Sequence, residues 1–584
     1  MTAMQNLWQL PNRSQKANFK QPLSEIAQNI LANRRITEGK EVVQILEPDY
    51  YRDLHDPFLM KDMKKAVTRI LKAIKNKEKI LIFGDYDADG VPATALLVCF
   101  FEKIGFTNFE TYIPDRHNEQ YGLSTSVVKK FATEGFNLII TVDCGVSNIE
   151  EVKVAKKLGL EVVVTDHHTV PEKRPLAVAV VDPKRPDDTY PYKYLSGTGV
   201  AFKLVQALII KGKFKDITLG WEKWLLDLVA IATVADMVPI TGENKVLVNF
   251  GLRVLQKTRR VGLLSLFNAL KLKPHYMAED DIGFMIGPRI NSAGRMAHAN
   301  DALNLILATD SNVALKIAGG LEDNNKARRN QVEEILVTVD KIYKKKPLAS
   351  VIVCGRDDWG LGVLGLAAGR VSEKYNRTTF IWARNGNGDI KGSCRSDGSI
   401  NVVELMALAS KEGLFLDFGG HEAAGGFSLA GAKLEQLEEV LNKVFEKLPQ
   451  KEVVEPLEAD MVLEFRDVSW SNYKEIEKLA PYGIDFPKPV FWFKNLTLDS
   501  VKEFGKTGGH LEIKFTDSEG VSLAAIAFFA CHPKTDLTDP SNHFWSGVIL
   551  KPGQKVEILA HIEKSTFKWK PELRLRIVDM RKIT

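Results

Sequence analysis

Short apolar runs that alternate with helical stretches constrain this chain more than any other feature. Four such runs occupy Lys79–Phe83, Asn137–Val142, Leu160–Thr165 and Ala177–Val181. Strands buried on both faces read as continuous apolar runs because neither face meets water. Strands that alternate with helices predict a parallel sheet with crossover helices. The first part of the chain is therefore predicted to be an open α/β domain.

The remainder of the chain divides into three further parts. Ser196–Leu272 reads as mostly helical, and Asn312–Lys346 reads as one long charged helix that stops before Pro347. A second, glycine-rich α/β unit begins at Ser350 and runs to about Leu448. Beyond Pro456, short β-rich runs predict a small all-β barrel, at Val490–Leu498, Leu511–Phe515, Ala524–Phe529, Val556–Ile562 and Leu573–Val578. The fold class is thus α/β, with two α/β domains joined by a long helix and followed by a C-terminal all-β, OB-like barrel.

Composition narrows the class of protein without identifying it. The 584 residues are too many for one ordinary domain. The sequence contains no run of about 18 apolar residues that would indicate a membrane span, and the polar segment Met1–Lys20 lacks a signal-peptide core. We therefore expect a cytoplasmic protein that does not bind a membrane. The net charge of +5 permits nucleic-acid binding. The five cysteines are scattered, which argues against a disulfide framework or a cysteine-ligated zinc site.

Carboxylates and imidazoles follow three successive predicted strands. Asp85-Tyr86-Asp87-Ala88-Asp89 lies between Gly84 and Gly90 after the first strand, Asp143 follows the second, and Asp166-His167-His168 follows the third. In an open parallel sheet these carboxyl ends meet at one crevice, where the strand order reverses. So many acidic groups repel one another unless a cation is present. Carboxylates with one or two imidazoles suit Mn²⁺ or Mg²⁺, and two ions 3.5–4 Å apart support phosphoryl transfer.

Each of these segments has an ordinary structural interpretation when taken alone. An Asp-rich loop after a strand is often an Asx-turn or a helix cap. A His-His pair is often a pair of surface side chains. The placement of all of them at three successive strand ends favours a metal site.

Longer segments carry a family resemblance. Phe83–Pro92 (FGDYDADGVP), Thr141–Asn148 (TVDCGVSN), Val164–His168 (VTDHH) and Leu226–Ile240 (LDLVAIATVADMVPI) resemble, in order, the four motifs of the DHH phosphoesterase superfamily. Within it the chain is most similar to the RecJ family of bacterial single-strand-specific 5′→3′ exonucleases. Further segments resemble that family: Leu195–Leu204 (LSGTGVAFKL), Gly287–Met296 (GPRINSAGRM) and Phe418–Leu429 (FGGHEAAGGFSL).

The resemblance implies a domain layout and an activity. An N-terminal extension over residues 1–60 precedes a DHH domain with a helical insert over 61–310. A connecting helix over 311–346 leads to a DHHA1 domain over 347–450, and an OB-like DNA-binding barrel covers 455–584. The implied activity is exonucleolytic hydrolysis of single-stranded DNA to 5′-mononucleotides in repair and recombination, with single-strand-binding protein and a RecQ-type helicase as further partners.

The resemblance also implies a ligand set for two divalent cations, Mn²⁺ or Mg²⁺. The implied metal ligands are Asp87, Asp89, Asp143, His167 and Asp236. The implied catalytic residues are Asp143, bridging both ions, and His168, stabilising the phosphate or the leaving group. Asp85 is left as an orienting partner. Two departures from the wider superfamily or from RecJ relatives stand out: Phe83, where many relatives outside RecJ carry histidine, and Gly360, where many RecJ relatives carry the histidine of a Trp-His-x-Gly segment.

Candidate DNA contacts lie in four segments. Cations hold the backbone of a single strand and aromatic rings stack on its bases, and arginine donates to phosphate through a planar fork. The resemblance implies that an arginine in these segments grips the 5′-terminal phosphate. For each arginine the alternative is a solvated surface side chain, and for the glycine-rich segment it is a packing turn. The candidates are Arg116, Tyr121, Arg289, Asn291, Arg295, Arg395, Gly420 and His421.

Aromatic residues interleaved with lysines in the last segment allow two interpretations. They fit single-strand binding, or they form the core of the barrel. The aromatic residues are Phe491, Trp492, Phe493, Trp545 and Trp569, and the lysines are Lys494, Lys551, Lys568 and Lys570.

Two other functions remain open from the sequence. One is a small-molecule DHH phosphodiesterase acting on cyclic dinucleotides or oligonucleotides, although such enzymes usually lack the barrel. The other is an inactive DNA-binding scaffold, although degenerate relatives lose acidic ligands that are present here.

Overall fold

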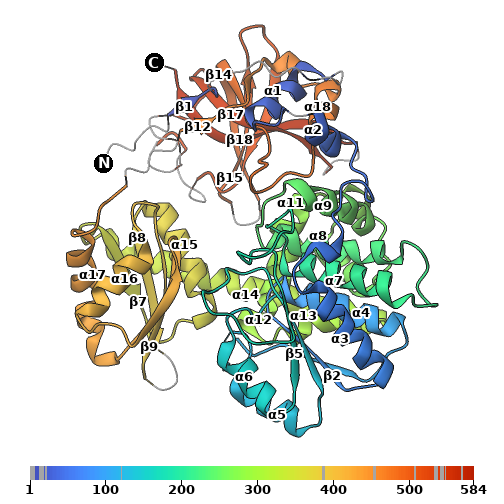
Figure 1. Ribbon diagram of the computed structural model, residues 1–584. Coiled ribbons are helices and arrows are strands. Elements are labelled where there is room, and N and C mark those ends of the chain that lie inside the picture. Colours follow the sequence, from blue (N-terminus) through green and yellow to red (C-terminus); the bar gives the residue numbers. More distant parts are fainter. Residues whose placement is uncertain are drawn as a thin grey trace. The chain divides into compact units, whose positions relative to one another are not determined.

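The computed structural model (Figure 1) describes residues 7–11, 19, 23–37, 39–116, 118–119, 121–384, 388–451, 456–505, 508–531, 537–539, 543, 545, 548–566 and 570–583. The chain forms two compact units. The α/β unit comprises residues 56–236 and 254–453, and the barrel unit comprises residues 1–55, 237–253 and 454–584. Within the described part of the chain, no helix combines the length and apolar character that a membrane crossing requires.

The first sheet of the α/β unit is fully parallel. Its order is β3 (Phe109–Tyr112), β2 (Ile80–Gly84), β4 (Leu138–Val142), β5 (Glu161–Thr165) and β6 (Ala179–Val181). Every residue of β2 and β4 is buried, which confirms the predicted buried strands. β3 is not among the strands predicted from the sequence, because its four residues (FETY) mix polar and apolar types and none is fully buried.

The strand order of this sheet reverses between β2 and β4. β3 lies outside β2, whereas β5 and β6 follow on the side of β4. α5 and α6 pack together and share a core with Leu81, Phe83 and Ile139, while α3, α4, α7 and α8 form a second group of packed helices. The bounds are α3 (Met63–Asn76), α4 (Gly90–Lys103), α5 (Thr125–Thr133), α6 (Ile149–Lys157), α7 (Gly197–Gly212) and α8 (Leu226–Ala235).

Helices connect this sheet to a second one. α14 (Ser311–Tyr343) begins after Asp310, whose carboxylate accepts from the backbone N–H groups of Asn312 and Val313. It matches the predicted long helix closely. The helices before it are α10 (Val261–Leu270), α11 (Glu279–Asp281), the π-helix η4 (Ile282–Ile286), α12 (Gly287–Met296) and α13 (Asn300–Leu307).

The second sheet is mixed, with the order β10-β11-β9-β8-β7. Only β7 and β8 pair in parallel, and the other neighbours are antiparallel. Its strands are β7 (Val351–Gly355), β8 (Thr378–Arg384), β9 (Ile390–Arg395), β10 (Asp417–His421) and β11 (Ala424–Leu429). The helices of this part are η5 (Leu361–Val363), α15 (Leu364–Tyr375), α16 (Val402–Lys411) and α17 (Leu437–Phe445).

The barrel unit closes a sheet on itself. β17 pairs with β18 on one side and returns to β14 on the other. Its strands are β13 (Met461–Val462), β14 (Phe491–Phe504), β15 (His510–Thr516), β16 (Ser522–Ala527), β17 (Lys555–Ser565) and β18 (Glu572–Lys582). The unit also contains β1 (Trp8–Gln9), which pairs with β12 (Leu457–Glu458). Its helices are α1 (Glu25–Asn33), α2 (Gly39–Leu46), α9 (Gly242–Leu255), whose residues up to Arg253 belong to this unit, and α18 (Trp470–Glu477).

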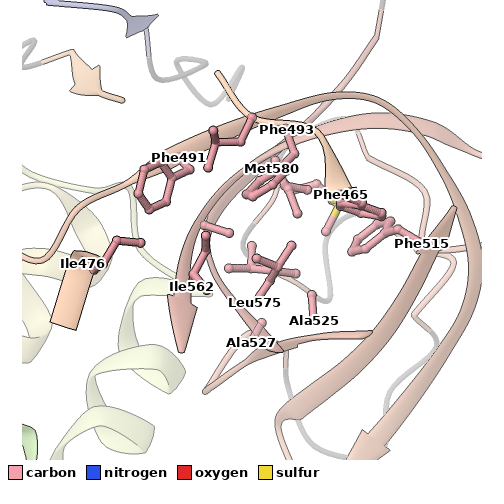
Figure 2. Close-up of a cluster of buried hydrophobic side chains, with 14 of the residues drawn as sticks. Phe465, Ile476, Phe491, Phe493, Phe515, Ala525, Ala527, Ile562, Leu575 and Met580 are labelled. Carbon is pink, nitrogen blue, oxygen red and sulfur yellow. The ribbon is translucent and has the colours of Figure 1, made fainter. Parts of the chain in front are cut away.

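The barrel interior explains most of the aromatic residues noted in the sequence. Figure 2 shows Phe491, Phe493 and Phe515 gathered with Met580 and Leu575 inside the barrel, and all five are buried. Trp545 is buried as well. Core packing is therefore the correct interpretation for Phe491, Phe493 and Trp545.

Trp492 is the exception among these aromatic residues. Because side chains alternate along β14, Trp492 lies on the outer face of the barrel, where it packs against Trp8, Arg581 and Lys494. Trp569 and Lys568 lie outside the described residues.

Candidate metal centre

The loops at the carboxyl ends of β2, β4 and β5 meet where the strand order reverses, as predicted. The imidazole of His167 lies at the centre of the group. Its Nε2 atom is 3.2 Å from Asp143 Oδ1, 3.6 Å from Asp89 Oδ2 and 3.6 Å from Asp236 Oδ2. Asp236 comes from the end of α8 rather than from a strand. Residues separated by about 150 positions in the chain thus surround one nitrogen atom.

The hydrogen bonds of His167 show which nitrogen is available to a metal. His167 Nδ1 lies 3.0 Å from the carbonyl oxygen of Leu195, so Nδ1 carries the proton and donates it. The lone pair of Nε2 then faces the carboxylates. Nε2 of His167, Oδ1 of Asp143 and Oδ1 of Asp85 are all buried without a hydrogen-bond partner among the described residues. Unpaired buried atoms are costly, and bound cations would give these atoms partners.

The same residues form overlapping sets of candidate ligands. Asp89, His167 and Asp236 form one set, Asp85, Asp87 and Asp143 form another, and Asp143, His167 and His168 form a third. In each set the ligand atoms lie within 4.8 Å of one another. We call these seven residues the acidic centre. Asp143 and His167 each belong to two sets, so the sets adjoin one another, an arrangement compatible with two neighbouring cations.

The electrostatics of the acidic centre also favour a cation. Burial, followed by the charges of Asp89, Asp87, Asp85 and Asp236, raises the pKa of Asp143 well above its ordinary value. Burial and the neighbouring carboxylates likewise raise the pKa of Asp236 to about 8. The carboxylates therefore resist ionising together, and a divalent ion would relieve that repulsion.

Asp166 holds the two histidines in place. Its Oδ1 atom accepts from Nδ1 of His168 at 2.7 Å and from the backbone N–H groups of His167 and His168, while Oδ2 accepts from Val146 N. Burial alone would lower the pKa of His168, but the hydrogen bond and charge of Asp166 outweigh it and raise the pKa to about 9. Asp166 is thus an orienting partner rather than a member of the candidate ligand sets.

The backbone of Asp143 adopts an uncommon conformation. Its φ is +61°, a region that few non-glycine residues occupy. The hydroxyl of Tyr121 donates to the carbonyl oxygen of Asp143 at 3.1 Å. Gly197 lies against the carboxylate of Asp143, where any Cβ atom would overlap it. Local structure and close packing together fix this carboxylate.

The N-terminus of α7 binds the carboxylate of Asp89. The backbone N–H groups of Gly197 and Thr198 donate to its two oxygens at 2.6 Å each. Such N–H groups and the helix dipole stabilise negative charge. In the sequence the segment LSGTGVAFKL stood out only by its likeness to the family. Ser196 as the N-cap before two glycines was the signal that could have revealed a helix N-terminus there.

Asn291 supports the loop between Asp85 and Asp89. Its side-chain oxygen accepts from the backbone N–H of Ala88 at 2.9 Å. Within the same loop, Asp87 Oδ1 accepts from the N–H groups of Asp89 and Gly90. A Cβ atom at Gly90 would lie 2.5 Å from the Cβ of Asp85, so only glycine lets the loop close. Asn291, expected as a DNA contact, therefore contacts the loop that carries Asp85, Asp87 and Asp89.

The other expected DNA contacts occupy different environments. Arg289 is buried, and its guanidinium on α12 forms an ion pair with Glu322 on α14 at 2.8 Å. Arg116 lies over the ring of Tyr86 at 4.8 Å. Tyr121 lies beside His168, with ring centroids 5.8 Å apart. Arg116 and Tyr121 thus flank the acidic centre.

Two further arginines lie where the two sheets of the α/β unit are joined. Arg295 NH1 donates to the carbonyl oxygen of Gly362 in η5 at 3.1 Å. Arg395 lies near α15, with NH2 3.3 Å from where a Cβ of Gly365 would be. Both side chains are only partly exposed.

The glycine-rich segment forms the edge hairpin β10–β11. Gly420 and His421 are exposed on β10, but a Cβ atom at Gly420 would overlap the carbonyl oxygen of Ala424. The glycine therefore has a packing role, and the exposed edge leaves backbone groups accessible.

The two departures from the family pattern also find places. Phe83 is buried and stacks on Tyr112. A Cβ atom at Gly360 would lie 2.7 Å from Gln331 Oε1, so a larger residue there requires Gln331 to move.

Asp182 is a buried carboxyl that the sequence analysis missed. It follows β6, the fourth predicted strand, and Asp182 Oδ2 has no hydrogen-bond partner among the described residues. Burial and then the charge of Asp166 raise its pKa to about 8. Its position after a strand was a usable signal, because the other strand ends carry the acidic centre.

Comparisons with known families match three regions of the chain. The DHH family N-terminal domain matches residues 79–233, the DHHA1 domain residues 347–448 and the RecJ OB domain residues 459–579.

Several curated relatives carry the name single-stranded-DNA-specific exonuclease RecJ, among them the following two. The protein of Bacillus subtilis is 34% identical over 90% of this chain, which spans 64% of that relative's length. The protein of Haemophilus influenzae is 31% identical over 85% of this chain and 88% of its own.

One solved relative supports both the fold and the metal. RecJ of Thermus thermophilus in complex with Mn²⁺ is 27% identical and superposes with a TM-score of 0.76, over 96% of this chain and 76% of its own; its Mg²⁺ complex gives 0.71. The likeness includes the barrel and gives no support to a small-molecule phosphodiesterase.

Proposed function

The chain belongs to the RecJ family of single-stranded-DNA-specific exonucleases, and we propose that its acidic centre hydrolyses single-stranded DNA from the 5′ end to 5′-mononucleotides. The observation that best supports this proposal is the group of buried atoms on Asp85, Asp143 and His167 that have no hydrogen-bond partner among the described residues. They supply oxygen and imidazole donors of the kind that Mn²⁺ and Mg²⁺ bind.

Asp87, Asp89, Asp143, His167 and Asp236 are the residues that would hold two divalent cations. When bound, such cations activate a water and neutralise charge on the phosphate. Asp143, held in its unusual backbone conformation, would supply a carboxylate to the cations. Asp85 lies close enough to Asp87 and Asp143 to join the set or to orient it.

His168 is the candidate general acid for the leaving group. In the metal-free protein Asp166 stabilises the imidazolium and raises the pKa of His168 to about 9, which suits a proton donor. The ring is 43% exposed and therefore accessible to a phosphate. In the proposed reaction a water attacks phosphorus in line, the bond to the 3′-oxygen breaks, and His168 donates a hydrogen bond or a proton to that oxygen.

Arginines near the acidic centre are suited to the 5′-terminal phosphate. Arg295 and Arg395 are partly buried and form no ion pair with an acid within the part of the chain that the structure describes, whereas Arg289 is paired with Glu322. Arg116 and Tyr121 flank the acidic centre and could meet the first nucleotide. A 5′ phosphate held at a fixed distance from the acidic centre would set the direction of digestion.

The setting of the enzyme follows from the same family membership. We propose that it works in the cytoplasm in DNA repair and recombination. Single-strand-binding protein and a RecQ-type helicase are proposed partners, because each supplies or protects the single strands that such an exonuclease consumes.

Digestion of end-labelled single strands tests this function. With Mn²⁺ or Mg²⁺, a 5′-labelled strand should release its label at once as a mononucleotide, and a 3′-labelled strand should shorten progressively. Release of the 3′ label first, or a preference for dinucleotides over long strands, would overturn the proposal. A duplex of the same sequence is the control and should persist.

A further inference from the structure

A second group of like charges lies outside the acidic centre, on the helices that join the two sheets of the α/β unit. It consists of Arg295 on α12, Arg328 and Arg329 on α14, and Arg370 on α15, and we call it the arginine cluster. No motif in the sequence drew attention to Arg328, Arg329 or Arg370. None of these three forms an ion pair with an acidic residue among the contacts that the described residues make.

Packing brings these helices together. α12 and α15 both pack against α14, and η5 contacts both α12 and α14. The bond from Arg295 to Gly362 connects α12 to η5. Trp359 packs with Ile335 of α14 and Leu364 of α15 in one core. The arginine cluster is therefore carried by a packed junction of three helices.

The electrostatics show that the arginines crowd one another. Burial, followed by the charges of Arg116 and Arg328, lowers the pKa of Arg295 to about 10. Burial, followed by the charges of Arg289, Arg329 and Arg370, lowers the pKa of Arg328. All the charged groups that shift Arg328 are thus arginines. Like charges placed together cost free energy unless an anion neutralises them.

Arg328 also has hydrogen-bonding capacity that the protein does not use. Its NH2 donates to Asn325 Oδ1 at 2.8 Å, which fixes the guanidinium against α14. Its Nε is buried and has no partner among the described residues. A buried donor of this kind calls for an acceptor, and the planar guanidinium matches the oxygens of a phosphate.

We propose that Arg328 and Arg370, next to Arg295, form a phosphate-binding site that holds a phosphate of the DNA strand other than the one at the acidic centre. The proposal rests on the proposed function, because the anion is part of the same substrate. The phosphate is either an internucleotide group or an additional group on the 5′ end, and both share the chemistry that arginine recognises. The site would secure the strand while the acidic centre hydrolyses it.

Salt-dependent binding to the full chain tests this site. Oligo(dT) is titrated in EDTA, so that no cleavage occurs, over a range of salt concentrations. Each phosphate contact on a single strand contributes about 0.7 to the slope of log Kd against log salt. Arg328→Gln and Arg370→Gln should each reduce the slope by about that amount. Arg377→Gln is the matched control and should keep the slope, since the guanidinium of this arginine in the same region donates to the backbone carbonyl of Asn376.

Oligonucleotides with three different 5′ ends identify which phosphate the site holds. If oligonucleotides with a 5′ hydroxyl, a 5′ phosphate and a 5′ triphosphate all lose the same slope, the site takes an internucleotide phosphate. A loss confined to phosphorylated ends assigns it to the 5′ end. Unchanged slopes in both variants, with all three ends, would overturn the proposal. Arg370 is exposed, so Arg370→Gln remains a fair test should Arg328→Gln fail to fold.

The metal reaction separates this inference from the proposed function. Wild-type protein that fails to hydrolyse single strands with Mn²⁺ contradicts the proposed function. Wild-type protein that hydrolyses them, while both variants bind with the wild-type slope, contradicts only the arginine site.

Discussion

The acidic centre and the arginine cluster solve opposite versions of one electrostatic problem. The acidic centre collects carboxylates whose pKa values rise because they repel one another, and the arginine cluster collects guanidinium groups whose pKa values fall for the same reason. In each, a buried polar atom lacks a partner among the described residues. Both the repulsion between like charges and the unpaired buried atoms raise the free energy of the folded protein. We infer that each group binds a counterion: a divalent cation in the acidic centre and a phosphate in the arginine cluster.

The two groups differ in how the chain builds them. The acidic centre sits on loops at strand ends, where the sheet fixes positions that are distant in sequence. The arginine cluster sits on the faces of packed helices. If this division is correct, variants of the acidic centre should change chemistry and metal binding, whereas variants of the arginine cluster should change only the affinity for DNA.

The largest effect is expected from Asp143→Ala. Removing a partner that merely supports a metal ligand costs 10–100-fold, so loss of a shared ligand should lower kcat by more than about a hundredfold. DNA binding in EDTA should remain, because the arginines are intact. Turnover with Mn²⁺ and titration of oligo(dT) measure the two properties, and Asp323→Ala on the exposed side of α14 is the control. Retained turnover would contradict the assignment of the acidic centre as the site of hydrolysis.

Asp166→Asn should have the next largest effect. The amide keeps the shape of the side chain but loses the charge that stabilises His168 and orients both histidines. We expect kcat to fall by about 10–100-fold, with little change in the affinity for DNA. The alkaline limb of the pH–rate profile should move to lower pH, because the pKa of His168 loses the contribution that raises it. A limb that stays in place would show that His168 does not act as an acid.

Asn291→Ala distinguishes two roles for one residue. The substitution leaves the buried N–H of Ala88 without its partner, at a cost of about 1–3 kcal/mol. Because that N–H belongs to the loop of Asp87 and Asp89, the concentration of Mn²⁺ needed for half-maximal activity should rise about tenfold. The Kd for oligo(dT) in EDTA should not change. The reverse result would return Asn291 to the role of a DNA contact.

The smallest effect is a change of stability with pH. The raised pKa values of Asp143 and Asp236 mean that the folded, metal-free protein retains protons that the unfolded chain has released. Its stability should therefore fall as pH rises from 6 to about 8. The raised pKa of His168 acts in the same direction, since its stabilising contribution fades as pH rises toward about 9.

Thermal unfolding in EDTA measures this dependence. Tm should decrease by a few degrees from pH 6 to pH 8, and Mn²⁺ should restore more stability at pH 8, because metal binding requires ionised carboxylates. Asp236→Asn should weaken the dependence. A Tm that rises over this interval would contradict the account of the acidic centre.

The sequence predicted the acidic centre well because local rules suffice there. Apolar runs identified β2, β4 and β5, and the residues that follow parallel strands must meet at one edge. Asp236 needed the family resemblance, because it ends a helix and no periodicity relates it to the strands. The N-terminus of α7 and Asp182 were missed although each carried a local signal.

The arginine cluster could not have been predicted in the same way. Whether Arg328 and Arg370 approach Arg295 depends on how three helices pack, and an arginine on a helix usually faces solvent. The barrel shows the same limit. Its strands were predicted, but which aromatic residues point inward follows from the register of β14, and the structure assigns Phe491 and Phe493 to the core and Trp492 to the outside.

Anomalous diffraction from crystals grown with Mn²⁺ would locate the bound cations themselves. We expect two peaks at the manganese edge, both within coordinating distance of Asp143 and at least one beside Nε2 of His167. Crystals that contain manganese elsewhere, with no peak among these side chains, would contradict this expectation.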